Sequence, residues 1–170
     1  MDITKKISGF FSIIILPFIA IIVIPLLILV FTYNKFSWRL NFTLILLPVI
    51  LGSLLIISGI YLLVITNNLF HVIGKGTLAP WNPPKLLVII GPYKYIRNPM
   101  IVAVLLILVG EIIITGSVIM FSWLIIFLIT NIIYFIYSEE PALVKRFGSD
   151  YKKYKEAVPM FIPKFIRKNY

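Results

Sequence analysis

The sequence contains no cysteine and only one histidine, His71, among its 170 residues. Without cysteine the chain has no disulfide bond, no thiol nucleophile and no metal site built on cysteine ligands. One histidine is too few for a histidine metal cluster, and no serine motif accompanies it to indicate a catalytic triad. We therefore expect no bound metal.

Charged residues are also scarce. They make up 13% of the chain, whereas hydrophobic residues make up 61%, and the mean hydropathy is +1.05. A soluble core of this length cannot hide that much apolar surface, so the composition predicts an integral membrane protein. Acidic residues number 6 against 16 basic ones. Because the basic residues flank apolar runs, we expect membrane lipids as the partner and no nucleic acid.

Four apolar segments are long enough to be expected as membrane helices, at about 10–33, 42–66, 99–114 and 118–137. Pro17 and Pro25 should bend the first of them. That first segment is too long for a signal peptide and lacks a cleavage site, so we interpret it as a retained span. Only Thr115, Gly116 and Ser117 separate the last two segments, which predicts a tight helical hairpin.

Basic residues are unevenly distributed between the connecting segments. Only Lys35 and Arg39 lie between the first two spans, while the other fourteen lie before the first, between the second and third, or after the fourth. The positive-inside rule then places both termini and the 67–98 loop in the cytoplasm. The isoleucine-rich, cysteine-free composition fits a prokaryotic plasma membrane.

The expected fold is an all-α integral membrane protein of one domain with about four transmembrane helices, the last two forming the tight hairpin. Phe147, Tyr151 and Tyr154 recur at helical spacing and predict the apolar face of a C-terminal cap. The expected parts are two N-terminal spans (1–66), a cytoplasmic loop (67–98), the helical hairpin (99–137) and a cytoplasmic helical cap (138–170).

Two polar elements of the 67–98 loop are candidates for a binding site. Gly74-Lys75-Gly76 can bring backbone N–H groups close to a ligand, or it can simply end a helix. In the second element, Asn98 suits a helix N-cap and Pro99 the first helical position. Arg97, just before them, is either part of a site or an anchor at the membrane edge.

The third polar element is the acidic pair Glu139-Glu140. We expect the fourth helix to end near Tyr137, where the helix dipole disfavours carboxylates. The pair is then either a solvated helix end or is compensated by a cation, and the candidates are Arg97 and a cationic ligand. Since neighbouring residues on a helix point about 100° apart, the two carboxylates should meet different partners.

A family resemblance is carried by two segments, GKGTLAPWNPPKLLVIIGPYKYIRNPM and EEPALVKRFGSDYKKYKEAVPMFIP. In order and spacing they resemble the isoprenylcysteine carboxyl methyltransferase and phospholipid methyltransferase family, over about residues 70–163. The resemblance implies a membrane enzyme that uses S-adenosylmethionine (SAM). In that family a Gly-x-Gly segment, an Arg-His-Pro-like segment and a Glu-Glu pair enclose SAM beneath a cytoplasmic cap.

The resemblance also implies roles for individual residues. Arg97 and Glu140 are expected in catalysis, and the cofactor-binding residues are expected to be Gly74, Gly76, Tyr93, Tyr95, Arg97, Asn98, Glu139 and Glu140. Trp81 and the tyrosines can pack on adenine or near the sulfonium by cation–π contact. Two departures leave the substrate open: Asn98 replaces the histidine of the family pattern, and Met100-Ile101-Val102 replaces a Tyr-x-Gly segment.

The methyl acceptor is expected to be a lipidic small molecule or a prenylated substrate. A carboxylate is already ionised at pH 7, whereas an amine must first lose a proton. This favours carboxylate O-methylation, with phospholipid amine N-methylation as the alternative. Two other interpretations stay open: a nicotinamide-dependent enzyme like the sterol reductases, and a non-catalytic membrane scaffold. Glu111, inside the third span, is expected to be structural, and His71 to lie at the membrane interface.

Overall fold

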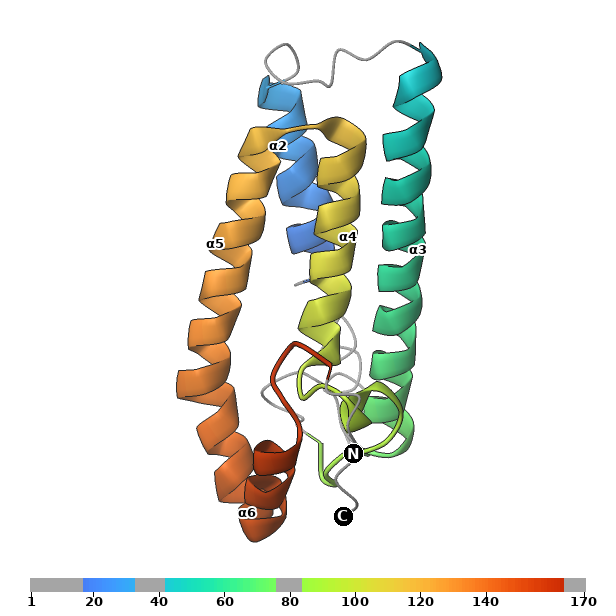
Figure 1. Cartoon of the computed structure of the whole chain (residues 1–170). Coiled ribbons are helices and arrows are strands. Elements are labelled where there is room, and N and C mark those ends of the chain that lie inside the picture. The colour runs from blue at the N-terminus through green and yellow to red at the C-terminus, as the bar shows by residue number, and fades with distance from the viewer. Residues whose placement is uncertain (1–16, 33–41, 76–83, 164–170) are drawn as a thin grey trace, which may run out of the picture.

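The computed structural model describes residues 17–32, 42–75 and 84–163. Every regular element within these ranges is helical, and Figure 1 shows helices α2 to α5 side by side with α6 at one end. The elements are η1 (Ile19–Val23), α2 (Ile24–Thr32), α3 (Phe42–Val72), η2 (Gly91–Lys94), α4 (Pro99–Thr115), α5 (Val118–Tyr134), η3 (Phe135–Glu139) and α6 (Glu140–Ala157). The segment 10–16 of the expected first span lies outside the described residues.

Helices α3 and α4 run antiparallel and touch backbone to backbone through glycines. A Cβ added to Gly59 would lie 2.7 Å from the Ala103 carbonyl oxygen and 2.6 Å from Ile107 Cγ1, and one added to Gly52 would lie 2.6 Å from the Gly110 carbonyl oxygen. Small residues let membrane helices approach this closely and gain van der Waals contact. The pair therefore forms a tightly joined unit on which the site is built.

The hairpin between α4 and α5 begins and ends as the sequence predicts. Asn98 accepts a hydrogen bond from the Ile101 N–H (3.3 Å) and Pro99 is the first helical residue. At the far end Gly116 takes the left-handed conformation (φ 66°), and Ser117 caps α5 by accepting from the Met120 N–H. These local interactions fix both ends of α4 and the sharp reversal that follows it.

A π-helical turn, η1, precedes Pro25 in the first helix. The Ile24 N–H donates to the Ile19 carbonyl, and proline has no N–H to offer the next carbonyl. The Ala20 carbonyl thus lacks a helical donor, and it accepts instead from the Trp123 indole N–H of α5 at 3.1 Å. The carbonyl that Pro25 leaves without a helical donor thus links the first helix to α5 through a hydrogen bond.

The prediction that the fourth helix ends near Tyr137 is wrong. A second π turn, η3, carries the chain from α5 into α6, with the Glu140 N–H donating to the Phe135 carbonyl. This wider turn accommodates Pro141, whose ring would otherwise press on the carbonyl four residues earlier. The acidic pair consequently lies inside a continuing helix and not at a helix C-terminus. The second helix also continues further than expected, from 66 to Val72.

Helix α6 turns back on itself at Gly148, whose backbone (φ 56°, ψ −127°) is not helical. Glycine is required here by conformation alone, because a Cβ at this position would meet no atom within 4 Å. The returning half buries Tyr151, Tyr154 and Val158 against Leu87 and other apolar residues of the loop. This is the cap face that the aromatic spacing predicted.

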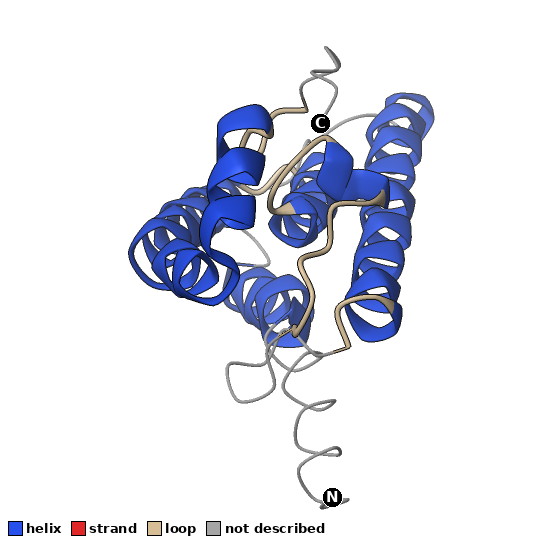
Figure 2. Ribbon diagram, turned by 90° about the horizontal axis from the view of Figure 1, so that it is seen from below, coloured by secondary structure: helices blue, strands red, loops and turns tan. Residues whose placement is uncertain are grey.

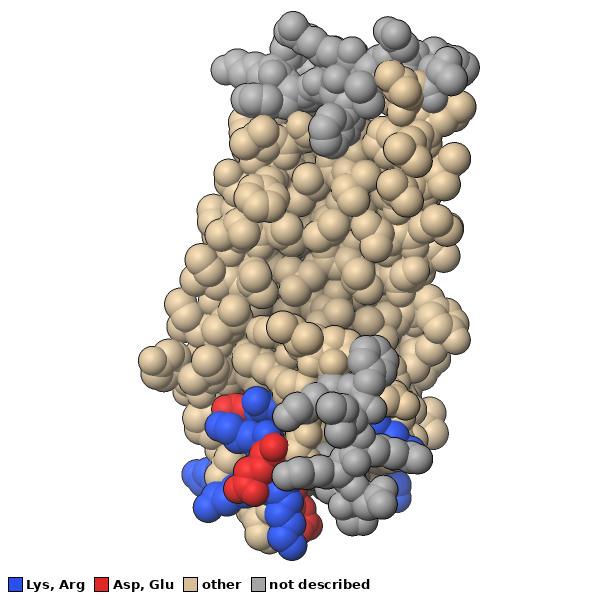
Figure 3. Space-filling model, in the orientation of Figure 1, with Lys and Arg blue, Asp and Glu red and all other residues tan. Residues whose placement is uncertain are grey.

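Apolar side chains cover the outside of the bundle. On the face seen in Figure 3, the charged residues gather at the end that holds α6, and Figure 2 views this end along the bundle axis. Two described helices are long and apolar enough to cross a membrane, Leu44–Val72 (mean hydropathy 2.5) and Val118–Ala157 (2.3). Only 17% of the most apolar stretch of each is buried, unlike the core helix of a soluble protein.

Candidate functional site

The site is built where the loop before α4 meets the cap. Tyr93, in the 3₁₀ turn η2, is buried, and its ring meets Phe70 of α3 edge-on at 5.3 Å between centroids. The Tyr93 carbonyl accepts a hydrogen bond from the Tyr154 hydroxyl of α6 at 2.7 Å. The loop is thus held by α3 on one side and by the cap on the other before it reaches Arg97.

The chain after α6 is bonded directly to the residues that start α4. The Arg97 N–H donates to the Pro159 carbonyl (2.8 Å) and the Asn98 N–H to the Met160 carbonyl (3.2 Å). Both donors precede the helix and need a partner outside it. The position of Arg97 therefore depends on a seated cap.

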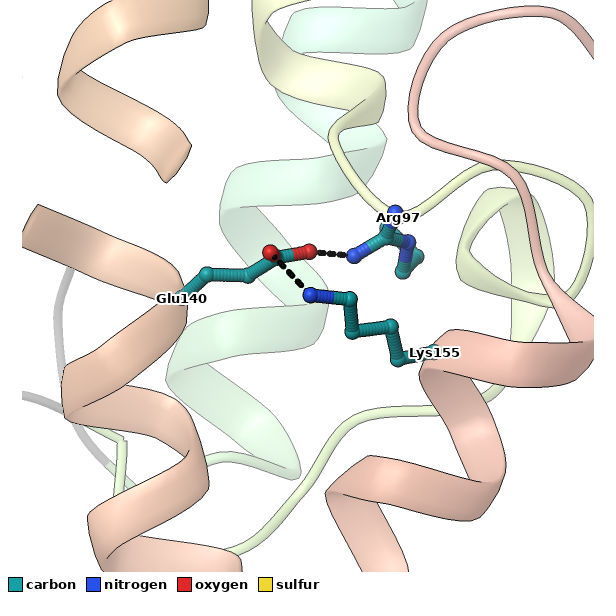
Figure 4. A network of polar contacts seen from close by, with 3 residues as sticks. All are labelled: Arg97, Glu140 and Lys155. Atoms are coloured by element: carbon teal, nitrogen blue, oxygen red, sulfur yellow. Dashed lines mark hydrogen bonds and ion pairs between the residues drawn. The ribbon is translucent and has the colours of Figure 1, made fainter. Parts of the chain in front are cut away.

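Glu140 receives two cations. Its carboxylate is in contact with the Arg97 guanidinium, and Lys155 Nζ lies 2.6 Å from the second carboxylate oxygen. Figure 4 shows the three side chains, with Lys155 reaching back from the returning half of α6. The Arg97 and Glu140 side chains are only 11% and 8% exposed, whereas that of Lys155 is 48% exposed. We call these three residues the Glu140 clamp.

The Arg97 guanidinium has further neighbours. Its carbon lies 5.7 Å from the centre of the Phe135 ring, within range of a cation–π contact. Burial raises the pKa of the Tyr151 hydroxyl, and the positive charge of Arg97 opposes that rise. Arg97 is therefore enclosed by a carboxylate, an aromatic face and a phenol, which is more than an anchor at the membrane edge requires.

Glu139 is in a different situation from its neighbour. It is partly exposed, and no ion pair or hydrogen bond joins its carboxylate to the described residues. The surrounding protein desolvates the carboxylate and raises its pKa from 4.5 to about 7. Burial raises the pKa of the Tyr93 and Tyr151 hydroxyls, and the charge of Glu139 adds a smaller rise to each.

Gly74 is engaged in the end of α3. Its N–H donates to the Leu69 carbonyl (3.3 Å), and its own carbonyl accepts from the Lys85 N–H (2.7 Å). A Cβ here would come within 2.7 Å of the Phe70 carbonyl oxygen. The left-handed residue of the turn is Lys75 (φ 49°). This geometry matches the helix-end interpretation for Gly74, while Gly76 and Trp81 lie outside the described residues.

Three other singled-out residues have different surroundings. Tyr95 is 47% exposed, and His71 is exposed in the last turn of α3. Glu111 is near the opposite end of α4, and its Oε2 is buried without a hydrogen-bond partner among the described residues. Of the predicted site residues, the structure brings together Tyr93, Arg97, Asn98, Glu139 and Glu140.

A hollow of about 160 Å³ lies on the flank of the bundle near the same end. Its lining is almost wholly apolar and comes from the first helix (Ile21, Ile22), α3 (Leu63, Asn67) and α4 (Met100). The Asn67 Oδ1 is buried without a hydrogen-bond partner among the described residues. Met100 is the second residue of α4 and comes three residues after Arg97, so the hollow is close to the clamp along the chain.

Sequence reasoning missed Lys155 and Phe135 as members of the site. Lys155 is fifteen residues from Glu140 and resembles the other lysines of the tail. Only the reversal at Gly148 brings it back. Phe135 is one of many aromatic residues in an apolar run, so nothing distinguishes it before the helices are packed. The sole available signal was Gly148 itself, a glycine within a helical pattern.

The fold and the clamp define a helical membrane protein with a charged, capped site at one end of its bundle. A model of the phospholipid methyltransferase family matches residues 42–150, well over half of the chain, and the chain therefore belongs to this family. That range includes α3, the hairpin and the acidic pair. No match was found among curated proteins. The family and the apolar helices together make the chain a membrane methyltransferase.

Proposed function

We propose that this protein transfers a methyl group from SAM to the headgroup of a membrane phospholipid. The observation that carries the proposal is the unequal use of the acidic pair. Glu140 is neutralised by Arg97 and Lys155, while Glu139 beside it has no partner among the described residues. An unpaired, desolvated carboxylate next to buried aromatic rings suits a cationic guest.

The residues present fit the chemistry of SAM. SAM supplies a methyl group on a positively charged sulfur and also carries an ammonium, a carboxylate and ribose hydroxyls. The Glu139 carboxylate can accept hydrogen bonds from the ammonium or a hydroxyl, and Arg97 can face the carboxylate. Tyr93 and Asn98 would line the same space, and cofactor contacts of Tyr95 and of the Gly74 and Gly76 N–H groups stay predictions.

In methyl transfer the protein mainly has to align the donor with the acceptor and exclude water, and it need not supply a nucleophile. Holding donor and acceptor in line is worth about 7–11 kcal/mol in favourable cases. The Glu140 clamp serves this purpose because it ties the start of α4 to both halves of α6. The backbone bonds from Arg97 and Asn98 to the segment after α6 close the same side.

The acceptor would reach the site from the bilayer. We place four helices across a prokaryotic plasma membrane, with both termini, the 67–98 loop and the α6 cap on the cytoplasmic side. The apolar hollow by Met100 opens on the flank of the bundle and is suited to the apolar part of a lipid. Phospholipid headgroups include amines, and the nature of the acceptor atom depends on whether the site can take up a proton.

Calorimetry of SAM binding to the detergent-purified protein tests the proposal. We expect saturable binding by wild type, at least a tenfold weaker affinity in Glu140→Gln, and wild-type affinity in Glu156→Gln. Glu156 is an exposed carboxylate on the same helix and serves as the matched control.

The same titration with NADPH distinguishes the other interpretations. Binding of NADPH in place of SAM would move the protein to the nicotinamide-dependent enzymes. Binding of neither ligand by folded protein would contradict the proposal and favour a non-catalytic scaffold.

A further inference from the structure

The hollow on the flank of the bundle is lined by one polar side chain, that of Asn67, among apolar ones. The Asn67 Oδ1 is buried without a hydrogen-bond partner among the described residues. A buried amide oxygen without a donor costs free energy, and native proteins rarely leave one unpaired. Asn67 is therefore an acceptor for which the described part of the chain supplies no donor.

The two polar residues next to Asn67 in the sequence do not share this condition. Thr66 is fully buried, but its hydroxyl donates to the Leu62 carbonyl (2.8 Å) and the Leu63 carbonyl (3.0 Å) of its own helix. Asn68 is exposed, so that its amide can be solvated by water or by lipid headgroups. Of these three neighbours, Asn67 is the one that lines the hollow and has a buried, unpaired acceptor.

The depth of Asn67 matches the level at which lipid chains join their headgroups. The apolar run of α3 ends at Ile65, and Asn67 lies five residues before the end of the helix at Val72. At about 1.5 Å per residue this distance is about 7–8 Å. The interfacial layer of a bilayer is about 5–8 Å thick on each side of the hydrocarbon. Leu63, one turn deeper in α3, belongs to the apolar part of the hollow.

We infer that the hollow holds the chain of a one-chain phospholipid and that Asn67 accepts a hydrogen bond from the free glycerol hydroxyl of this lipid. The inference rests on the proposed function, because it names the class of the phospholipid acceptor. In a two-chain glycerophospholipid the glycerol oxygens that carry the chains are esters, which have no hydrogen to donate. Loss of one chain leaves a hydroxyl at that level and a single chain beside it.

The size and the position of the hollow agree with such a lipid. Pockets that enclose a whole small ligand are about 300–1,000 Å³. A hollow of about 160 Å³ takes a segment of one chain and leaves the rest in the bilayer. Met100 also lines the hollow and comes three residues after Arg97. A lipid with its chain against Leu63 and its hydroxyl at Asn67 would therefore have its headgroup on the side of the Glu140 clamp.

The test is a competition between lysophosphatidylethanolamine and its 2-deoxy analogue, which lacks only the glycerol hydroxyl. Native mass spectrometry of the detergent-purified protein separates the two complexes by mass. We expect wild type to bind the hydroxyl lipid about tenfold more tightly, because the deoxy lipid leaves the Asn67 oxygen unpaired. Asn67→Leu should bind both lipids equally. Asn68→Leu, at the exposed neighbour, is the matched control and should keep the wild-type preference.

A second variant tests the location of the chain without changing Asn67. Ile22 lines the hollow and is 46% exposed, so that Ile22→Trp fills the hollow from its outer side. Both lipids should bind about tenfold more weakly to Ile22→Trp, with their ratio unchanged. Leu26→Trp, one turn further along the first helix and 58% exposed, is the control and should bind like wild type.

Four results would overturn the inference. The first is equal binding of the two lipids by wild type, as expected if water already pairs with the Asn67 oxygen. The second is a hydroxyl preference that survives Asn67→Leu, as expected for lipid bound adventitiously elsewhere. The third is unchanged binding in Ile22→Trp. The fourth is displacement of the one-chain lipid by equimolar dioleoyl phosphatidylethanolamine or ceramide phosphoethanolamine, which would assign the hollow to a two-chain lipid.

Failure of the inference and failure of the proposed function can be told apart by SAM calorimetry on the same protein. SAM binding without a hydroxyl preference would overturn the inference and leave the methyltransferase proposal standing. A hydroxyl preference that depends on Asn67, without SAM binding, would overturn the proposed function and leave a lipid site. Absence of both would overturn both.

Discussion

Glu140 receives its two cations under very different conditions of burial. Arg97 lies in the protein with 11% of its side chain exposed, while Lys155 is 48% exposed and in contact with water. Charge pairs away from water are strongly coupled, because removing one partner leaves the other desolvated and unpaired. Exposed pairs are weakened by solvent. The two arms of the clamp should therefore contribute unequally.

We predict that Arg97→Met lowers the free energy of unfolding by about 3–5 kcal/mol, as breakage of a buried pair does. Lys155→Met should lower it by less than about 1 kcal/mol. Reversible unfolding in mixed micelles measures both. Lys152→Met, an exposed lysine on the same helix, is the control and should be neutral. Equal losses for Arg97→Met and Lys155→Met would contradict the assignment of burial.

The raised pKa of Glu139 predicts a pH dependence of stability. The folded protein holds this proton up to about pH 7, while the unfolded chain releases it near 4.5. Between these values the folded state binds more protons, so stability falls as the pH rises. The contribution is complete below about pH 4.5 and is lost as the pH passes through about 7.

Thermal unfolding of wild type and Glu139→Gln from pH 4 to 8 checks this sign. The wild-type midpoint, taken relative to Glu139→Gln, should decrease over that window and then stay level. A relative midpoint that increases with pH would show that Glu139 is stabilised as a carboxylate and has an ionic partner.

At the scale of elements, the antiparallel contact of α3 with α4 depends on glycines seven residues apart. Gly52 and Gly59 on α3 each receive backbone and isoleucine atoms of α4, and Gly110 on α4 receives atoms of α3. Atoms of the other helix thus occupy the space that a side chain at each glycine would need. Arg97 lies two residues before the start of α4, so this contact also helps to set the position of the clamp.

We predict that Gly59→Ala destabilises the protein by about 1–3 kcal/mol. Alanine is intrinsically the better helix former by about 1 kcal/mol. The steric clash outweighs this gain in helix propensity, because the new methyl group would lie 2.7 Å from the Ala103 carbonyl oxygen and a backbone atom cannot move alone. Ser58→Ala, on the exposed side of the same turn, is the matched control. A more stable Gly59→Ala protein would show that the helices are less tightly packed than described.

At the scale of the whole molecule, the charged end holds the candidate site and the opposite end holds the short hairpin turn. Because the basic residues favour the cytoplasm, the clamp should face the cytoplasm and the turn at Gly116 should face the outside. The chain has no cysteine, so single introduced cysteines report on sidedness without background.

We predict that Val118→Cys, beside the hairpin turn, reacts with a membrane-impermeant maleimide on intact cells. Ser149→Cys, in the exposed bend of α6, should react only after permeabilisation. Both positions are exposed, so accessibility to the reagent is comparable. The reverse pattern would contradict the proposed orientation.

Some of this architecture was determined by the sequence alone. The ends of α4 and the start of α5 follow from Asn98, Pro99, Gly116 and Ser117, because caps and left-handed glycines act through neighbours a few residues away. Hydrophobic runs and aromatic spacing likewise predicted the helical class and the buried face of the cap. The family resemblance, carried by short segments around the hairpin, agreed with the family match.

The tertiary structure alone decided how the acidic pair is used. Sequence reasoning expected a helix end near Tyr137, where the apolar run ends, but a π turn carries the helix on into α6. It also left open which glutamate Arg97 meets. That depends on the reversal at Gly148, which brings Lys155 back to Glu140, and on the close approach of α3 and α4. Contacts of this kind join residues far apart in the chain, and their energies exist only once the helices are packed.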